Sequence, residues 1–385
     1  MRFAFILVAL TAFTMSAFSA LAFETNARAA YVVDLNTGMV LIDRNSDVPL
    51  PPASMSKLMT LNMLFEALED GRVALDSRFS VSDRASSLGG STMFLDRRDR
   101  PTVEELIKGI VVLSGNDACV VVAEGLSGTE EEFVRQMNQR AAALGMTSAK
   151  FANSSGWPHP EHRMSSRDLV FLANRIITEF PEYYGYFGME EFMWDGRAPQ
   201  NRFNRNPLLK LDIGADGLKT GHTEEAGYGL VGSAMQGDRR IVFTLAGLGS
   251  KRERAEVAER VVNWAFRHFI TKDIAARDEA MAELPVWRGA QSTVRLVAPD
   301  DISILVPAGG VGDVSATLNY RTPVEAPIEK GRQLGELTVS VDGIPEHRYP
   351  LVADRDVAEG GIISRLVAAT NVLFDAAWNA AFEAP

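Results

Sequence analysis

Ser54 and Lys57 are the residues whose types and spacing most directly suggest chemistry. A serine hydroxyl is a weak nucleophile that needs an adjacent base, and a lysine can serve if burial and neighbouring cations keep it neutral. The two residues follow Pro51-Pro52, where a proline-rich turn gives way to a helix. Side chains three residues apart share one face of a helical turn, so the pair can meet. The alternative is that Ser54 is only a helix N-cap.

The segment after Pro52 is expected to form the helix that positions this pair. Its apolar residues recur at helical spacing until Gly71, which reads as the helix stop; they are Leu58, Leu61, Phe65 and Leu68. Ser54 would then lie at the N-terminus of a buried helix, where the dipole and free N–H groups favour developing negative charge. No other lysine of the chain has a serine three residues before it.

Two further motifs follow, Ser114-Gly115-Asn116 and Lys219-Thr220-Gly221. Ser114, on a loop between helices, can relay a proton to a leaving amine, and Asn116 can hold Lys57 and a substrate amide. Their side chains point the same way only if this loop is extended. Lys219 would lower the pKa of Lys57, and Gly221 leaves an edge strand open to a substrate peptide. Each motif alone also fits a cap, a turn or an exposed strand pair.

The three motifs, in this order, resemble those of the serine penicillin-recognising enzymes, which include penicillin-binding proteins and β-lactamases. The longer segments Leu113–Cys119, Asp216–Thr223 and Gly227-Tyr228 resemble the low-molecular-mass D-alanyl-D-alanine carboxypeptidases. The resemblance covers nearly the whole chain. It implies an α+β fold with a β-lactamase/transpeptidase-like catalytic domain, a serine-type carboxypeptidase activity and no cofactor or metal.

The resemblance also implies roles for single residues. Ser54 would be acylated by the penultimate D-alanine of a peptidoglycan stem peptide ending in D-Ala-D-Ala, terminal D-alanine would leave, and water would hydrolyse the acyl-enzyme. The backbone N–H groups of Ser54 and His222 would form the oxyanion hole, and Thr220 would contact the terminal carboxylate. β-Lactams would acylate Ser54 as covalent inhibitors.

One position departs from the family pattern. Many relatives place a carboxylate-binding arginine near the strand end that aligns with Gly249, whereas here the basic residues nearby are Lys251, Arg252 and Arg254. The residue that binds the substrate carboxylate is therefore open.

Three other functions share features with this chain. β-Lactamases of the commonest class carry Ser-Asp-Asn and a glutamate on an Ω loop, while this chain has Ser114-Gly115-Asn116 and no matching glutamate motif within 153–166. An endopeptidase that cuts peptide cross-links differs from a carboxypeptidase only in the pocket for the leaving group. A non-catalytic cell-envelope scaffold is the alternative from another class. His159 and His162 lack a third convergent ligand, which favours surface histidines over a metal site.

Composition restricts the cellular setting. Residues 1–22 combine Arg2 with an apolar run ending in Ala20-Leu21-Ala22, which predicts a cleaved signal peptide; a retained anchor is the alternative. The single cysteine, Cys119, excludes an internal disulfide framework. A net charge of −11 argues against nucleic acid as a partner. We expect an exported, periplasmic protein at the outer face of the inner membrane.

The pattern of elements predicts how the chain is divided. Residues 23–275 are expected to form the catalytic domain, beginning with a hairpin over 31–42, followed by helices and a return to strands over 217–248. Residues 281–356 read as a small all-β, sandwich-like domain of short alternating strands. Residues 359–385 have the period of an amphipathic helix, expected to lie on the membrane surface or, alternatively, to dock on protein.

Overall fold

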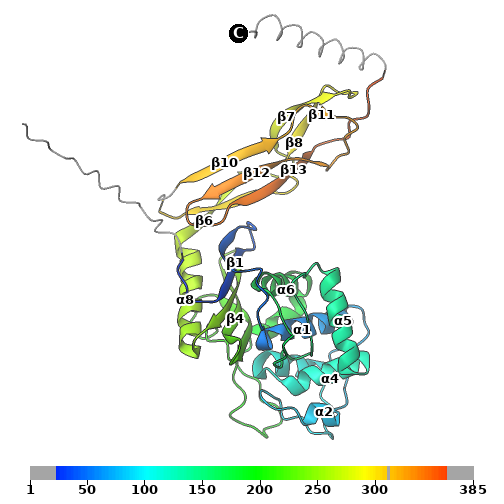
Figure 1. Cartoon of the computed structure of the whole chain (residues 1–385), viewed down its shortest axis with the longest axis vertical. Coiled ribbons are helices and arrows are strands. Elements are labelled where there is room, and N and C mark those ends of the chain that lie inside the picture. Colours follow the sequence, from blue (N-terminus) through cyan, green and yellow to red (C-terminus); the bar gives the residue numbers. More distant parts are fainter. Residues whose placement is uncertain (1–22, 310–312, 362–385) are drawn as a thin grey trace, which may run out of the picture.

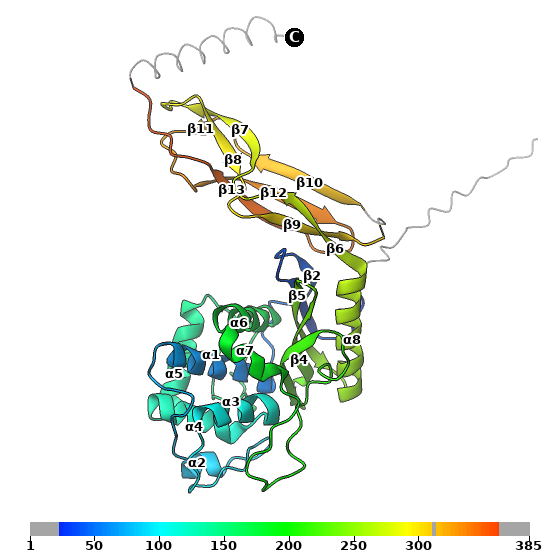
Figure 2. The same ribbon diagram turned by 180° about the vertical axis from the view of Figure 1, so that it is seen from behind.

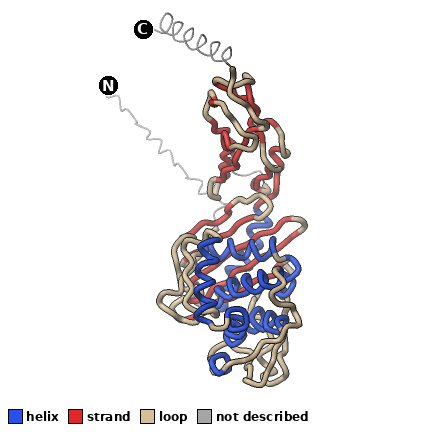
Figure 3. Tube along the Cα trace, turned by 90° about the vertical axis from the view of Figure 1, so that its right-hand side faces the viewer, coloured by secondary structure: helices blue, strands red, loops and turns tan. Residues whose placement is uncertain are grey.

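The computed structural model describes residues 23–309 and 313–361. Within these, a region of mixed helices and strands is followed by an all-β region (Figures 1 and 3). This is the α+β architecture that the sequence predicts. The predicted signal peptide, 1–22, and nearly all of the predicted amphipathic helix, 359–385, lie outside the described residues.

A five-stranded antiparallel sheet in the order β2-β1-β5-β4-β3 organises the mixed region. Its strands are β1 Ala29–Asp34, β2 Val40–Arg44, β3 Ala215–Thr223, β4 Gly227–Gln236 and β5 Arg239–Leu248. The predicted hairpin and the three later strands are therefore confirmed. β3 lies at an edge of the sheet, so the Lys219-Thr220-Gly221 motif lies on a strand with one neighbour.

Helices cover both faces of this sheet (Figures 1 and 2). α8 packs on β4 and β5 from one side. On the other side, α6 packs on β1 and β5 and also contacts α1 and α7. The α-helices are α1 Lys57–Glu69, α2 Asp83–Ser86, α3 Val103–Lys108, α4 Asn116–Ser127, α5 Glu130–Ala143, α6 Ser166–Glu179, α7 Pro181–Tyr184 and α8 Lys251–His268. Short helical turns are the 3-10 helices η1 Ala53–Ser56 and η3 Gly185–Gly188 and the π-helix η2 Gly109–Leu113.

The sheet separates two hydrophobic cores. One core gathers the apolar residues of α1, α3, α4, α5 and α6, with Leu58, Leu61 and Phe65 of α1 fully buried. The helical spacing of these residues in the sequence thus marks a helix enclosed by others. The second core lies between the sheet and α8 and continues into the all-β region.

The all-β region contains a six-stranded sheet, β10-β12-β13-β8-β7-β11, and a two-stranded sheet, β6-β9. The strands are β6 Phe269–Ala275, β7 Ala280–Trp287, β8 Thr293–Val297, β9 Ile302–Pro307, β10 Val314–Tyr320, β11 Val324–Glu325, β12 Gln333–Val341 and β13 His347–Ala353. The sequence analysis expected short alternating strands over 281–356, and β6 lies before that range. β6 follows α8 directly and pairs with β9, so the all-β region begins at Phe269.

The turn between β1 and β2 connects the two regions. Met39 in this turn is fully buried, and its Sδ accepts a hydrogen bond of 3.0 Å from the backbone N–H of Leu305 in β9. The Tyr349 hydroxyl in β13 lies 3.0 Å from the carbonyl of Thr37 and 2.9 Å from that of Ser303. The hairpin is thus held by the all-β region through packing and hydrogen bonds.

None of the helices within 23–309 and 313–361 is long and apolar enough to span a bilayer.

Candidate active site

The short turn η1 presents Ser54 in front of α1. Ser54 is half-buried, whereas its neighbours Ala53, Met55 and Ser56 are buried. The N-cap of η1 is Pro52, and that of α1 is Ser56, which makes no side-chain capping bond. The alternative that Ser54 is an N-cap is therefore wrong. Its hydroxyl instead faces Lys57.

Lys57 is fully buried, and its Nζ lies within hydrogen-bond distance of three oxygens. These are Ser54 Oγ at 2.9 Å, Asn116 Oδ1 at 2.8 Å and the Ser155 carbonyl at 2.5 Å. The amide and carbonyl oxygens can only accept, whereas a hydroxyl can also donate. A neutral lysine has two N–H bonds and one lone pair. If Asn116 and Ser155 take both N–H bonds, the lone pair is left for the Ser54 hydroxyl.

Burial lowers the pKa of Lys57 from 10.5 to about 8. The positive charge of Arg205 acts in the same direction, against the opposing effects of Cys119 and Asp117. A substantial fraction of Lys57 is then neutral near physiological pH. Arg205, which the sequence analysis did not single out, is thus a second cation near Lys57, in addition to Lys219, whose charge and that of Lys57 repel each other.

The Ser114-Gly115-Asn116 loop carries two of the candidate residues in different directions. Ser114 has a left-handed backbone, with φ 61° and ψ 35°, so the loop is not extended as the sequence analysis required. Ser114 Oγ accepts a hydrogen bond of 2.9 Å from Lys219 Nζ, while Asn116 begins α4 and faces Lys57. The amide of Asn116 is oriented by its Nδ2, which donates to the Gly89 carbonyl at 3.0 Å.

The edge strand β3 brings the third motif against the nucleophile turn. Lys219 is buried, and its pKa is well below the ordinary value because of burial first and of repulsion from Lys57 second. A Cβ at Gly221 would lie 2.8 Å from the Pro52 carbonyl, so this glycine allows β3 to approach η1. The missing side chain serves this packing, and the free edge of β3 remains available to a peptide.

Thr220 and His222, which follow Lys219 on β3, differ in the exposure and the contacts of their side chains. Thr220 is buried beside Lys219 and its carbonyl accepts a hydrogen bond of 3.2 Å from Lys219 Nζ. The His222 ring is exposed and stacks on Tyr228 at 3.8 Å between centroids. The ring is therefore engaged with Tyr228 and, through Nδ1, lies 3.1 Å from the Gly227 carbonyl oxygen.

The loop 153–157 contacts α1 through two backbone carbonyls next to Lys57. The sequence analysis did not predict this role. The Ser154 carbonyl accepts from Thr60 Oγ1 at 2.6 Å, and the Ser155 carbonyl accepts from Lys57. Ser155 acts through its backbone, which no side-chain motif could reveal. Glu161, the only glutamate within 153–166, pairs with Lys150 at the surface instead of facing the site.

Trp157 forms a wall beside this loop. Its side chain is 46% exposed. A Cβ built at Gly90 would lie 3.0 Å from the indole Cζ3 and 3.1 Å from Asn116 Nδ2. The indole ring and the Asn116 amide are therefore close neighbours, with apolar ring surface open to solvent at the mouth of the site.

The three basic residues near Gly249 have different surroundings. Arg252 pairs with Glu256 on the exposed face of α8, and Lys251 is exposed. Arg254 is buried, donates from Nη2 to the Arg205 carbonyl at 3.3 Å, and contributes to lowering the pKa of Lys219. Its Nε has no hydrogen-bond partner within the described chain. Arg254 is therefore the one of the three that joins the cationic side of the site.

His162 contradicts the expectation of two surface histidines. Its side chain is buried, packs edge-on against Phe151, and accepts a hydrogen bond of 3.4 Å at Nδ1 from the Ala152 N–H. Burial lowers the pKa of His162 to about 4, so the ring is neutral. His159 is exposed. The pair is split between core and surface.

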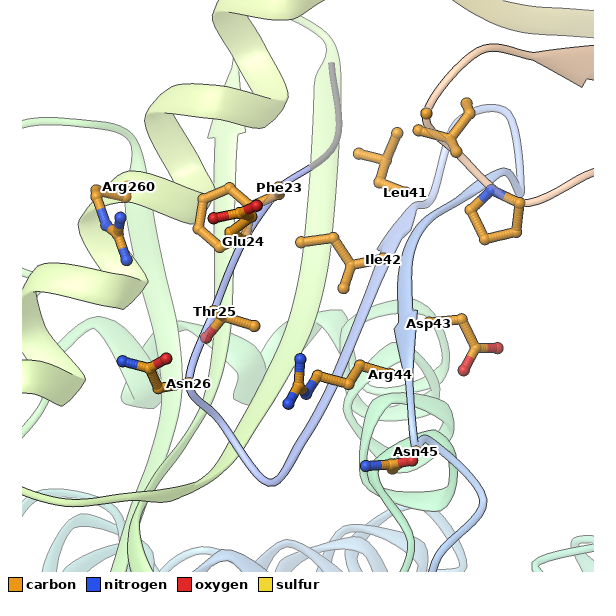
Figure 4. A pocket seen from close by; sticks show the side chains of 13 residues that line it. Phe23, Glu24, Thr25, Asn26, Leu41, Ile42, Asp43, Arg44, Asn45 and Arg260 are labelled. Atoms are coloured by element: carbon orange, nitrogen blue, oxygen red, sulfur yellow. The ribbon is translucent and has the colours of Figure 1, made fainter. Parts of the chain in front are cut away.

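A separate hollow of about 1030 Å³ lies between the N-terminal segment, β2, α8 and the turn 343–345 (Figure 4). Its lining includes Phe23, Glu24, Arg44 and Arg260, and none of its residues belongs to the three motifs. The candidate site is therefore defined by the contacts around Lys57 and not by this hollow.

Comparisons with known proteins agree with the geometry. A family described as D-alanyl-D-alanine carboxypeptidase matches residues 14–247, and one described as penicillin-binding protein 5, C-terminal domain, matches residues 269–359. The D-alanyl-D-alanine carboxypeptidase DacF of Bacillus subtilis is 35% identical over 347 residues, which cover 88% of each chain.

Solved structures are also similar. Penicillin-binding protein 5 of Haemophilus influenzae has a TM-score of 0.76 and 30% identity, covering 88% of this chain and 99% of its own. Penicillin-binding protein D2 of Listeria monocytogenes, in an ampicillin-bound form, has a TM-score of 0.57 and 28% identity, covering 63% and 98%. The chain thus belongs to the D-alanyl-D-alanine carboxypeptidase family, the low-molecular-mass penicillin-binding proteins.

Proposed function

We propose that this protein is a serine-type D-alanyl-D-alanine carboxypeptidase that acts through an acyl-enzyme on Ser54. The observation that carries the proposal is the environment of Lys57. The amine is buried, has a pKa lowered to about 8, and meets two oxygens that can only accept and one hydroxyl that can donate. Such an amine is suited to remove the proton of Ser54.

Acylation follows from these contacts. The Ser54 proton passes to the lone pair of Lys57 Nζ while Oγ forms a bond to the carbonyl carbon of the penultimate D-alanine. The backbone N–H groups of Ser54 and His222 would stabilise the resulting oxyanion. Collapse breaks the peptide C–N bond, and the leaving amine takes the proton that Lys57 had accepted, which returns Lys57 to its neutral form. Ser114, hydrogen-bonded to Lys219 at 2.9 Å, supplies the relay for that proton.

Hydrolysis then needs a second proton transfer. Water adds to the acyl ester, Lys57 accepts the water proton, and the Ser54 oxygen leaves with a proton returned from the lysine. Glu161 is held at the surface by Lys150, so no glutamate of the 153–166 loop serves as the base. This separates the site from the β-lactamases that activate water with a glutamate.

The terminal carboxylate of the substrate is expected to bind Arg254 and Thr220. Arg254 is buried next to the Lys219 end of the site, and its Nε lacks a partner within the described residues. A carboxylate satisfies such a guanidinium with charge-assisted hydrogen bonds. We propose Arg254 in the role left open by the sequence, with Lys219 orienting the same end of the substrate.

The substrate class is a peptidoglycan stem peptide ending in D-Ala-D-Ala, with β-lactams as covalent inhibitors of Ser54. An exported enzyme at the outer face of the inner membrane fits the predicted signal peptide and the amphipathic pattern of 359–385. A D,D-endopeptidase has the same acyl chemistry, and a cell-envelope scaffold would need none of it.

Release of D-alanine from a peptide ending in D-Ala-D-Ala tests the proposal. We expect the wild-type chain to release D-alanine and Ser54→Ala to release none while keeping its thermal unfolding temperature. A cross-linked dimeric peptide, tested in parallel, identifies an endopeptidase if it is cut faster than the linear peptide. Equal D-alanine release by Ser54→Ala would overturn the proposed nucleophile.

A further inference from the structure

β10, at one edge of the six-stranded sheet, is exposed along almost its whole length. Its seven residues, VSATLNY, include none with a charge. Val314 is 42% and Tyr320 44% exposed. An exposed, uncharged strand edge presents free N–H and C=O groups to another chain, and proteins usually avoid this by placing charges there.

The other sheet edges of the described chain are protected. β2, β3, β6 and β11 each contain at least one charged residue, and β9, though uncharged, is mostly buried. β10 therefore differs from every other edge strand within 23–309 and 313–361. Figures 1 and 2 show it along the outer margin of the all-β region, away from the catalytic region.

The register of β10 leaves apolar side chains without cover. Ala316 and Leu318 are paired with Val339 and Leu337 of β12, which are buried in the core. On the same face, Val314 is paired with Val341, which is also buried in the core, and Tyr320 with Gly335, yet the side chains of Val314 and Tyr320 remain 42% and 44% exposed. Another strand added at this edge would continue the sheet and place its own side chains beside those of β10 on the open side.

The charges that flank β10 indicate that the added strand is β10 of a second copy of this chain. Asp313 precedes the strand and Arg321 follows it, and both are exposed. Suppose that two copies of β10 pair antiparallel about a two-fold axis at Thr317. A residue that lies a given number of positions before Thr317 in one copy is then opposite the residue that lies the same number of positions after Thr317 in the other copy. Asp313 of one copy then lies opposite Arg321 of the other, and this happens at both ends.

The same axis pairs the whole strand. Thr317 is the central residue of Val314–Tyr320, so the register that joins the opposite charges also uses every residue of the strand. Ala316 then lies opposite Leu318, and Ser315 opposite Asn319. We propose that β10 is a self-association edge, through which two copies of this protein join their six-stranded sheets antiparallel about Thr317.

A seven-residue strand pair is a small interface, so we expect a dissociation constant that is roughly micromolar or weaker. The catalytic regions of both copies would remain free in such a dimer, since β10 contributes nothing to the Ser54 site. The proposal is thus independent of the reaction assigned to that site.

Symmetric cross-linking tests the register. A two-fold at Thr317 places Thr317→Cys opposite itself, while Ser315→Cys would be separated from its own copy by four residues, roughly 13 Å along the strand. The native Cys119 is buried and provides a silent background. Under mild oxidation of the full chain, we expect a disulfide-linked dimer with Thr317→Cys and little with Ser315→Cys. Equal cross-linking of both, or of neither, would overturn the proposal.

Charge reversal provides an independent test by sedimentation velocity. Asp313→Arg alone, or Arg321→Asp alone, puts like charges together at both ends and should weaken dimerisation about tenfold. The double variant restores opposite charges and should recover wild-type association. A monomeric wild-type chain at high micromolar concentration, or a double variant no better than the singles, would contradict the two-fold pairing.

Discussion

The pH dependence of Ser54 acylation should report the protonation of Lys57. With a pKa of about 8, the neutral fraction of Lys57 is about 50% at pH 8 and about 1% at pH 6. The second-order rate of acylation by a penicillin should therefore rise about fiftyfold between these pH values and level off above about pH 9. Stopped-flow or quenched mass measurements of the acyl-enzyme give this rate directly.

Arg205→Gln provides the perturbation. Removing this positive charge raises the pKa of Lys57, because the arginine disfavours the ammonium form. The rising limb should move to higher pH, so at pH 7 the variant acylates more slowly relative to its own plateau. Using each variant's own plateau removes any effect of Arg205 on penicillin binding.

Arg252→Gln is the matched control, since Arg252 is exposed and pairs with Glu256 away from the site. Its profile should overlay that of the wild type. A wild-type rate that is flat from pH 6 to pH 9 would refute Lys57 as the base. A rate that keeps rising tenfold per unit to pH 10 would refute the lowered pKa.

Three further substitutions test how the site and the hairpin are held. Gly156→Ala would place a Cβ 1.9 Å from the Ala53 carbonyl at a backbone φ of +77°, so we expect a loss of about 2 kcal/mol or more in unfolding free energy and slower acylation. Trp157→Ala should raise KM for a D-Ala-D-Ala peptide several-fold with little change in kcat, because it removes a wall beside Asn116. Tyr349→Phe leaves the Thr37 carbonyl without its partner and should cost about 1 kcal/mol of stability while activity is kept.

Each of these variants has a control. Gly237→Ala has a similar backbone, φ +60°, but nothing within 4 Å of its Cβ, so it isolates the backbone cost from the collision. Trp287→Ala and Tyr320→Phe remove exposed groups of the all-β region. Chemical denaturation gives the unfolding free energy of each variant, and steady-state kinetics gives its KM and kcat. Equal values for a variant and its control would contradict the reasoning.

The sequence was sufficient for the parts of the site that depend on side-chain type and local spacing. Ser54 and Lys57 meet because both lie on the same short helical segment, and α1 forms because its apolar residues keep helical spacing. The structure also brings Lys219 to Ser114, although 105 positions separate them. The order of the motifs predicted that both residues belong to one site, but their contact with each other was not predicted.

The remaining features depend on tertiary placement. The Ser155 carbonyl is a backbone group, and the exposed Arg205 acquires its influence only from where its loop lies relative to Lys57. His162 is buried although its loop reads as surface. β6, FITKDIA, alternates poorly and is recognisable as a strand only through its pairing with β9. Sequence spacing contains none of this information.

Intact-protein mass measurement after incubation with benzylpenicillin, followed by peptide mapping, tests the central claim most directly. We predict one covalent penicilloyl adduct on the peptide containing Ser54, and none in Ser54→Ala with the fold retained. An adduct on another residue, or an unmodified wild-type chain, would contradict the assignment of Ser54 as the nucleophile activated by Lys57.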